Sequence, residues 1–456
     1  MSEEITKDFK RIAPKRWKRY PRYKDSGVEW IGEIPTNWRV YRLKELAKIN
    51  PSKTEKNHLP DDLEVSFVPM ESIGEYGGIS GAEAKKLLDV KQGYTYFAEG
   101  DLIVAKITPC FENYKGAIAT DLVNGIGFGT TELFVLRPNE RSDSRYLFYV
   151  SISKAFRETG SKIMHGAAGQ KRITVDFINN YPVALPKPEE QSQIVGFLDE
   201  TLKRVDSLIT KKQRLIELLK EKRAAIITRA VTKGLDPNAP MKDSGIEWIG
   251  EMPKHWNIGL IKQGYQVTLG KMLQPNKRSE NDFEAPYLRS ANIQDGFVDT
   301  SEIKTMYFNK SEDHLLLEEG DLLVCEGGDV GRAAIWSNQV SNCRFQNSIN
   351  RIRSKTNSVR YLFYLLKASK RSGFIDFLCN RATISHFTAE KVKGLRIVYP
   401  DMTEQLKIAN YLDKETSRMN SFISKIEKSI ELLKEYRSAL ITAAVTGKID
   451  VREEVP

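Results

Sequence analysis

Short polar segments that combine amide and cationic side chains are the part of this sequence with the clearest capacity for chemistry. HGAAGQKRIT, which begins at His165, and RFQN, which begins at Arg344, both place an amide close to cations. Such side chains read purine edges in the major groove of DNA or hold phosphates. The candidate residues in the first half of the chain are Lys106, Lys115, Gln170, Lys171 and Arg172. Those in the second half are Arg289, Asn292, Arg332, Arg344, Gln346, Asn347, Asn380, Arg381, Ser385 and His386. Each residue alone is equally well explained as a solvated surface group, so only the pattern as a whole predicts nucleic-acid binding.

Catalytic motifs do not accompany these candidates. GIGFGT, from Gly125, has a glycine spacing found in nucleotide-binding loops, but it precedes the strand-like TELFVL instead of opening a helix, so we expect a turn. GYQVTLGKM, from Gly264, has the wrong spacing for a phosphate loop and carries Met272 where Ser or Thr is required. The sequence has no NPPY-like or DPPY-like tetrapeptide of an amino-methyltransferase, and its five histidines and four cysteines lack metal-site spacing. We therefore expect a non-catalytic chain that binds no metal or cofactor of its own.

The net charge gives weak support for a polyanionic partner. The formal charge is +10 and the pI is near 9.1, which favours phosphate binding through release of counterions. The densest basic patch runs from Lys10 to Lys24 and holds eight Lys or Arg and no acid. It is either an arm on a phosphate backbone or a mobile terminus. No apolar run approaches the roughly 18 residues that span a bilayer, and the first residues do not resemble a signal peptide. We expect a cytoplasmic protein with no membrane partner.

The elements that must position these loops are encoded twice. KDSGVEWIGEIPTNW, from Lys24, returns as KDSGIEWIGEMPKHW, from Lys242, with identity at 11 of 15 positions. EGDLIV, from Glu99, recurs as EGDLLV, from Glu319, and RYLFY recurs unchanged. A repeat of this length predicts two copies of one fold. Between the matched segments the two halves differ almost completely, as expected of two domain copies that recognise different things.

A long helical segment closes each copy. The two segments that begin with EQ align without a gap, lack proline and are rich in Leu, Ile, Lys, Glu and Arg, which favours helix. We expect Asp401 or Thr403 to cap the second helix. We expect Gly234 and Gly447 to end the first and the second helix.

Apolar residues recur every seven positions along both helices. This spacing requires another helix to cover the seam, and we expect the two copies to pair in antiparallel as a coiled-coil spacer, with the polar Lys212 setting the register. Packing of each helix onto its own domain is the alternative. The seam positions are Leu198, Val205, Lys212, Leu219 and Ile226 in the first helix, and Leu412, Met419, Ile426, Leu433 and Leu440 in the second.

Residues 39–185 and 257–399 carry short apolar runs, such as DLIVAKI, TELFVL and LRIVYP, broken by Gly, Asn and Pro. They predict α/β (α+β) domains with a mostly β core and one clear helix each, around Tyr146 to Phe156 and from Tyr361 onward. Because the motif at Lys24 has no helix before it, the end of the second helix should return close to that motif. We therefore expect a pseudo-two-fold, quasi-cyclic molecule with neighbouring termini.

The duplicated motifs resemble those of a known family, the DNA specificity subunits of type I restriction-modification systems. DSGxEWIGExPxxW opens each half, EGDLIV or EGDLLV stands at mid-domain, and a proline followed by an EQ-led helix closes each half. The resemblance covers roughly residues 24 to 450 and matches the variable inserts in position only. The basic extension ahead of Lys24 has no counterpart among the shared motifs.

The resemblance implies two target-recognition domains, each of which reads one half of a bipartite, asymmetric double-stranded DNA site. It implies two modification subunits that bind S-adenosylmethionine and restriction subunits that use ATP and Mg, all as partners in a bacterial or archaeal cell. The expected layout is a basic N-terminal extension (1–23), target-recognition domain 1 (24–187), spacer helix 1 (188–235), target-recognition domain 2 (236–401), and spacer helix 2 with a tail (402–456).

Two alternatives stay open. One is a specificity subunit of a related system in which a single partner chain carries both nuclease and methyltransferase. The other is a coiled-coil assembly protein that binds no DNA.

Overall fold

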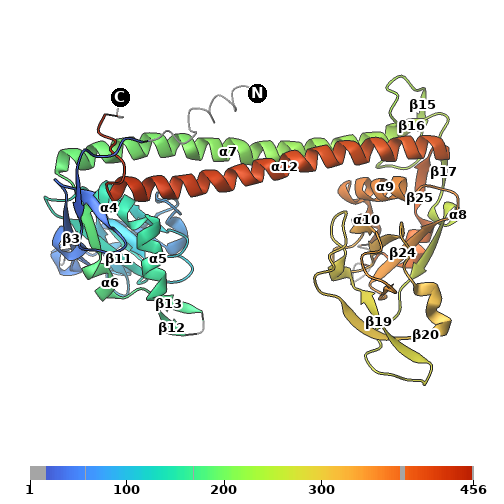
Figure 1. The fold of residues 1–456 in the computed structure, drawn as a ribbon, viewed down its shortest axis with the longest axis horizontal. Coiled ribbons are helices and arrows are strands. Elements are labelled where there is room, and N and C mark those ends of the chain that lie inside the picture. The colour runs from blue at the N-terminus through green and yellow to red at the C-terminus, as the bar shows by residue number, and fades with distance from the viewer. Residues whose placement is uncertain (1–16, 57, 168, 380–385, 454–456) are drawn as a thin grey trace. The chain divides into compact units, whose positions relative to one another are not determined.

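The structure, a computed structural model, describes residues 17–56, 58–167, 169–379 and 386–453. It divides into two compact units (Figure 1). Unit 1 holds the described residues up to Lys212 together with those from Lys428 onward, and unit 2 runs from Gln213 to Glu427. The C-terminal end of the chain therefore belongs to the same unit as the N-terminal half. No helix within the described ranges has an apolar stretch of the length that crossing a bilayer demands.

Unit 1 contains two four-stranded sheets with the strand orders β6-β5-β10-β7 and β4-β11-β8-β9. The pairing of β5 with β10 is parallel, and the other pairings in these sheets are antiparallel. Two-stranded pairs β1-β2, β3-β14 and β12-β13 complete the unit. The strands are β1 Tyr23–Asp25, β2 Glu33–Pro35, β3 Arg39–Arg42, β4 Ala47–Ile49, β5 Glu64–Val68, β6 Glu83–Lys86, β7 Thr95–Ala98, β8 Leu102–Ala105, β9 Gly116–Ile118, β10 Ile126–Gly129, β11 Leu133–Pro138, β12 His165–Ala167, β13 Gln170–Arg172 and β14 Pro182–Leu185.

Unit 2 repeats this plan. Its sheet β18-β24-β21-β22 corresponds to β4-β11-β8-β9, and its sheet β20-β19-β23, with β19 and β23 parallel, corresponds to β6-β5-β10. The pairs β15-β16 and β17-β25 correspond to β1-β2 and β3-β14. The strands are β15 Met241–Asp243, β16 Glu251–Pro253, β17 Asn257–Leu260, β18 Tyr265–Leu269, β19 Asp282–Leu288, β20 Lys304–Asn309, β21 Leu322–Cys325, β22 Ala333–Ile335, β23 Arg344–Phe345, β24 Ile349–Ser354 and β25 Arg396–Tyr399. The predicted mixture of helices and strands, built twice, is confirmed.

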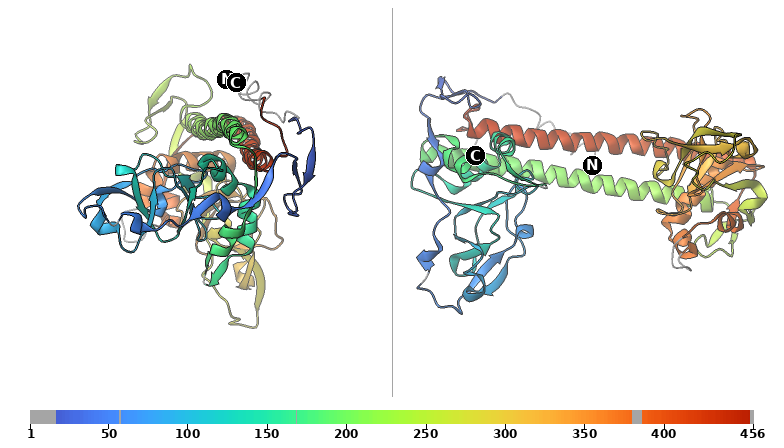
Figure 2. Two further views of the ribbon diagram at one scale, coloured as in Figure 1. Left: turned by 90° about the vertical axis from the view of Figure 1, so that its left-hand side faces the viewer. Right: turned by 90° about the horizontal axis from the view of Figure 1, so that it is seen from below.

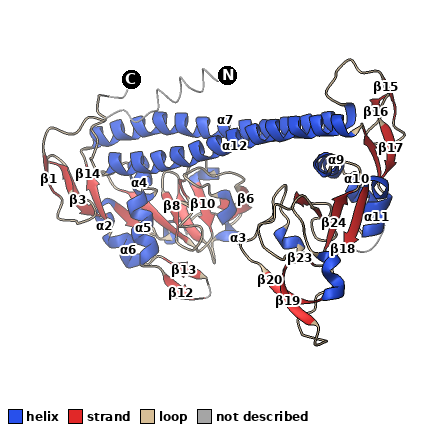
Figure 3. Ribbon diagram, turned by 45° about the vertical axis from the view of Figure 1, so that its right-hand side comes forward, coloured by secondary structure: helices blue, strands red, loops and turns tan. Residues whose placement is uncertain are grey.

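Shorter helices connect the strands, and Figure 3 distinguishes the two kinds of element. Where one helix was expected around Tyr146 to Phe156, the structure has two, because Ser153 caps a new helix by accepting the amide N–H of Phe156. The helices of unit 1 are α2 Leu43–Leu46, α3 Leu87–Val90, α4 Ser144–Ser151, α5 Lys154–Lys162 and α6 Val175–Asn180. Those of unit 2 are α8 Ile261–Gly264, α9 Val359–Arg371, α10 Phe374–Cys379 and α11 Ala389–Gly394.

The GIGFGT segment is a buried strand, β10, so the prediction of a turn was wrong. Its glycines serve close packing: a Cβ on Gly127 would lie 2.1 Å from the ring of Phe97 on the paired strand β7. The absence of side chains here lets an aromatic ring lie across the strand.

The two long helices are α7, Pro188–Lys233, and α12, Met402–Val445. The side chain of Asp401 accepts the amide N–H of Glu404 at 2.9 Å, so Asp401 is the N-cap, as one of the two predicted residues. Gly234 and Gly447 follow the helix ends with φ of 75° and 69°, the left-handed conformation that glycine adopts without strain. Both predicted end positions are confirmed.

Within each unit the two long helices run side by side and antiparallel (Figures 1 and 2). Arg437 pairs with Asp206 in unit 1, and Arg223 donates to Asn420 in unit 2. Seven seam positions are buried, namely Leu198, Val205, Lys212, Leu412, Met419, Leu433 and Leu440, and Leu219, Ile226 and Ile426 are half-buried. In each unit the helices also pack onto the domain, because one apolar cluster joins helix and sheet residues. Both alternatives for the apolar seam are therefore realised: the helices pair with each other and also pack onto the domain.

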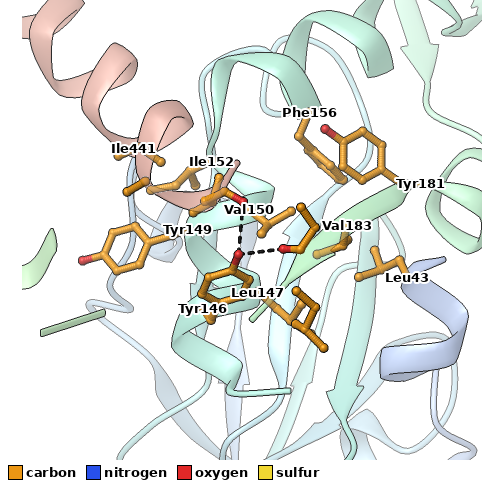
Figure 4. Close-up of a cluster of buried hydrophobic side chains, with 14 of the residues drawn as sticks. Leu43, Tyr146, Leu147, Tyr149, Val150, Ile152, Phe156, Tyr181, Val183 and Ile441 are labelled. Carbon is orange, nitrogen blue, oxygen red and sulfur yellow. Dashed lines mark hydrogen bonds between the residues drawn. The ribbon is translucent and has the colours of Figure 1, made fainter. Parts of the chain in front are cut away.

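A buried tyrosine links each domain to the end of the helix from the other copy. In unit 1, the hydroxyl of Tyr146 donates to the carbonyls of Ala184 on β14 and Val445 at the end of α12, at 2.7 and 3.0 Å (Figure 4). In unit 2, Tyr361 donates in the same way to the carbonyls of Val398 on β25 and Val231 at the end of α7, at 2.9 and 3.1 Å. The end of α12 thus has the same place in unit 1 that the end of α7 has in unit 2.

The EQ pair that begins each long helix holds the opening motif of its own copy. The indole N–H of Trp38 donates to Glu190 at 3.1 Å, and that of Trp256 donates to Glu404 at 3.2 Å. The side-chain amide of Gln191 accepts the N–H of Asp143 at 2.8 Å, at the start of α4. These contacts explain why the two motifs recur together.

The ends of the described chain meet in unit 1, as the quasi-cyclic layout predicts. Lys448 donates to the carbonyls of Ile31 and Glu33, and the N–H of Asp450 donates to the carbonyl of Lys18 at 2.8 Å. Lys233 makes the corresponding bonds in unit 2, to the carbonyls of Ile249 and Glu251. From Trp17 onward the basic extension is thus packed against the protein, and its preceding residues lie outside the described ranges.

Candidate nucleic-acid interface

A hairpin bonded to a strand end holds several of the candidate residues of unit 1. The hairpin β12-β13 follows α5, and the N–H of Ile173 donates to the carbonyl of Lys106, directly after β8, at 2.9 Å. The Thr108 hydroxyl donates to the carbonyl of Gly169 at 2.7 Å and accepts the N–H of Lys171 at 3.0 Å. The structure therefore brings Lys106 together with the predicted residues of the hairpin.

Charge at this strand end is partly neutralised. Arg172 binds the Glu132 carboxylate with two bonds of 2.8 Å, and this pairing lowers the pKa of Glu132. The ammonium of Lys106 lies 5.4 Å from the ring centroid of Phe134. Gln170 and Lys171 are exposed on β13. The Arg172 guanidinium is thus paired with Glu132, whereas Gln170 and Lys171 carry exposed polar groups.

An ion pair between a buried aspartate and a half-buried arginine joins two of these strands in each unit. Asp101, of the EGD motif, is 1% exposed and binds Arg137 of β11 with two bonds of 2.8 Å. Asp321 binds Arg353 of β24 in the same way, at 2.7 and 2.8 Å. The carboxylate raises the pKa of each guanidinium. The aspartate of the repeated EGD motif therefore joins the two strands at the ends opposite to Lys106 and Glu132.

Lys115 and Arg332, two further candidates, donate to nearby carbonyls. The Lys115 ammonium donates to Met70 at 2.9 Å, and the Arg332 guanidinium donates to Ser290 at 2.9 Å. Arg289 lies 3.1 Å from Glu302. All three side chains are half-buried and have partners within their own domain.

Asn292 and Arg344, two further predicted residues, are buried and bonded within their own domain. The Asn292 amide donates to the carbonyls of Asp299 and Glu302, both at 3.0 Å, and closes a loop. Arg344 is 5% exposed and pairs with Asp313 at 2.8 Å. Their polar groups therefore have partners within unit 2.

The other candidates of unit 2 lie around the same strand ends. Gln346 and Asn347 are half-buried between β23 and β24, and His386 is exposed. A Cβ on Gly327 would lie 3.6 Å from the ring of His386, which places that ring beside the loop after β21. Asn380, Arg381 and Ser385 lie outside the described residues.

Glu326 is a further candidate, which a pattern of amides and cations in the sequence does not reveal. It lies directly after β21, as Lys106 lies after β8. The signal was present in the repeat, since EGDLIVAK and EGDLLVCE place Lys106 and Glu326 at the same position.

This geometry, a duplicated α/β domain with divergent loops at matched strand ends, can be compared with known proteins. A family profile described as the type I restriction modification DNA specificity domain matches residues 35–219 and 253–432. The chain belongs to this family. The two matched ranges contain one copy of the repeat each, so the type I DNA specificity domain occurs here twice.

Curated relatives agree with the family assignment. The chain is 26% identical to the type I restriction enzyme EcoEI specificity subunit of Escherichia coli, over 91% of this chain and 81% of that protein. It is 40% identical to the EcoAI specificity subunit of the same species over 41% of this chain and 33% of that protein. It is 23% identical to the putative MjaX specificity subunit of Methanocaldococcus jannaschii, over 92% of this chain and 96% of that protein.

Solved structures show the same fold. A chain from a study of complex assembly and conformational transition of the type I R-M system matches with a TM-score of 0.72 and 17% identity, covering 90% of this chain and 98% of that chain. The HsdS subunit from Thermoanaerobacter tengcongensis matches with a TM-score of 0.54 and 18% identity, covering 91% and 98%.

Proposed function

We propose that this specificity protein recognises a bipartite, asymmetric site in double-stranded DNA and directs partner methyltransferase and restriction subunits to it. The observation that carries the proposal is the doubling of one fold with different groups at matched strand ends. Each unit would read one half-site, and because the loops differ, the half-sites would differ.

The chemistry would come from the partners. We propose two modification subunits that bind S-adenosylmethionine and restriction subunits that use ATP and Mg, and a purely recognising role for this chain in the cytoplasm of a bacterium or archaeon. The paired long helices would act as a spacer between the half-sites, since the separation of two DNA-reading elements sets the spacing of their half-sites.

Exchange of one insert tests the modular reading. Residues 39–185 are replaced by the matching segment of another member of the family, and the complex with its modification partners is assayed by mapping methylated positions. One half-site is expected to change while the other stays the same. A change in both half-sites would contradict the proposal.

Removal of one heptad from both helices tests the spacer. Deletion of Lys212 to Leu218 together with Ile426 to Leu432 is expected to shorten the gap between the half-sites without altering their sequences. An unchanged gap would count against the spacer role.

Salt dependence separates recognition from simple assembly. The affinity of the complex for DNA is expected to fall steeply with salt, because bound phosphates release counterions. An assembly protein that binds no DNA would show no such affinity. A neighbouring gene that encodes nuclease and methyltransferase on one chain would indicate the related system, in which the DNA-reading role is the same.

A further inference from the structure

Three positions at the strand ends match between the units, and their side chains differ in charge. The N–H of Lys106 donates to the carbonyl of Glu132, and the N–H of Glu326 donates to the carbonyl of Ser348, both at 2.9 Å. The carbonyl of Lys106 accepts the N–H of Ile173 at 2.9 Å, and that of Glu326 accepts the N–H of Phe387 at 2.8 Å. The backbone therefore equates Lys106 with Glu326, Glu132 with Ser348, and Arg172 with His386.

In unit 1, internal pairing leaves a cation at this place. Glu132 is neutralised by the two bonds from Arg172. The Lys106 ammonium is half-buried beside Phe134 and has no ion pair with another described residue within 4 Å. The side chain at this strand end is a hydrogen-bond donor.

In unit 2, the same place holds an unsatisfied acceptor. One carboxylate oxygen of Glu326 is buried and has no hydrogen-bond partner among the described residues. Ser348, which replaces Glu132, carries no charge, and its hydroxyl oxygen accepts the N–H of Ser290 at 3.1 Å. Burial also raises the pKa of Glu326.

A carboxylate held in this way destabilises the folded chain. A buried polar oxygen without a donor costs free energy, and a donor supplied by a ligand would recover that cost. The complementary ligand group is an N–H donor.

Resting on the proposed function, we propose that position 106 in unit 1 and position 326 in unit 2 are matched base-reading positions of opposite hydrogen-bonding character. Glu326 accepts a hydrogen bond from the exocyclic amino group of a cytosine or adenine in one half-site. Lys106 donates to the acceptor edge of a guanine in the other. Both pairings follow the pattern of donors and acceptors in the major groove.

The test uses the full chain assembled with its modification partners. Binding is measured on oligonucleotide duplexes in which each base pair of both half-sites is varied in turn. Glu326→Gln is expected to reduce discrimination at one base pair of one half-site by about tenfold or more, since Gln offers a donor as well as an acceptor. Lys106→Met is expected to have an effect of similar size at one base pair of the other half-site.

Matched controls come from the same repeat. Glu319→Gln removes an exposed carboxylate of the EGD motif in unit 2, and Lys154→Gln removes an exposed cation of unit 1; neither is expected to change discrimination. Thermal unfolding gives a readout that separates reading from support. Glu326→Gln should leave the melting temperature equal or higher, whereas a structural carboxylate would lower it when removed.

Unchanged discrimination by Glu326→Gln, or a uniform loss of affinity for all duplexes, would overturn the inference. Altered discrimination in both half-sites by either variant would also overturn the inference. A wild-type complex without sequence preference would instead refute the proposed function itself, so the two failures are distinguishable.

Discussion

The two units use the same contacts where a long helix meets its domain, yet they fill the space beside that helix differently. In unit 1, Arg437 of α12 pairs with Asp206 at 2.8 Å and lies 3.5 Å from the ring centroid of Tyr76. Tyr76 stacks on Tyr114, and the guanidinium of Arg157 lies 5.6 Å from the centroid of that second ring. The insert of unit 1 is thus joined to the helix by a stack of aromatic rings and guanidinium groups.

At the matching position of unit 2, Arg223 of α7 lines a cavity of about 430 Å³. Its partner is the neutral Asn420, the counterpart of Asp206. Beside the cavity lies an ion pair of 2.8 Å between Lys367 and Asp295.

This difference separates two kinds of contact. Contacts encoded in the repeated motifs, such as those of Tyr146 and Tyr361, decide where a domain sits on its helix. Contacts from the variable inserts decide how firmly the insert is held there. We expect the insert of unit 1 to open less often than that of unit 2.

The largest expected effect comes from removing the aspartate–arginine ion pair that occurs once in each unit. Asp101→Ala should destabilise unit 1 by about 3 kcal/mol, because it leaves the Arg137 guanidinium without its buried partner. Asp321→Ala should do the same to unit 2. Hydrogen exchange followed by mass spectrometry should show faster exchange in β8 and β11 for the first variant, and in β21 and β24 for the second. Equal loosening of both units by one variant would break the comparison.

The buried tyrosines come next. Tyr146→Phe and Tyr361→Phe should each cost about 1 to 3 kcal/mol, since two buried carbonyls lose their donor. Urea unfolding monitored by exchange at α4 or α9 measures the loss in each unit. A cost confined to one of the two variants would show that the helix ends do not play equivalent parts.

The aromatic stack should matter in unit 1 alone. Tyr76→Ala is expected to cost about 1 kcal/mol, the usual size of a cation–π contact at a half-exposed site. Exchange in the loop around Tyr76 should then rise toward that of the matching loop at residues 293–298 in unit 2. No change in exchange at that loop would mean that the stack does not hold the insert.

Substitution of Lys212 is expected to have the smallest effect, and this substitution should stabilise the fold. Burial lowers the pKa of Lys212 from its ordinary 10.5. At pH values between the folded-state pKa and 10.5, the unfolded chain binds more protons than the folded chain, so the stability of the wild-type protein should rise with pH. Below the folded-state pKa, the destabilisation caused by burying the charged lysine is fully present. Lys212→Met should raise stability at neutral pH by about 1 kcal/mol or less and remove this rise. Unfolding measured from pH 7 to 10 checks both parts; a destabilised variant would show that the lysine supports the seam.

The repeated features could be predicted from the sequence because their signals are local or periodic. The caps at Asp401 and Gly234 and the seam at Leu198 or Leu412 need only their own neighbourhood in the chain. The neighbouring termini follow from the order of the repeat alone.

The failures share one cause, which is that burial depends on tertiary contacts. Gly127 looked like a turn residue because nothing in GIGFGT reveals that Phe97 packs across it. Asn292 and Arg344 have the chemistry of DNA readers, yet Asn292 bonds to the carbonyl of Glu302, ten residues on, and Arg344 pairs with Asp313, 31 residues back, contacts that the sequence does not reveal. Glu326 was overlooked for the opposite reason, since its importance depends on what the matching Lys106 does in the other copy.

The exchange of helix ends between the copies has a consequence for the order of synthesis. Unit 2 is a continuous stretch, Gln213 to Glu427, whereas unit 1 also requires the residues from Lys428 onward. Domains form during translation once all their parts have emerged. The unit translated second is therefore the first whose sequence is complete. The N-terminal domain must wait with an uncovered apolar face until Val445, Ile449 and Val451, which are made after the whole of unit 2, leave the ribosome and are buried against it.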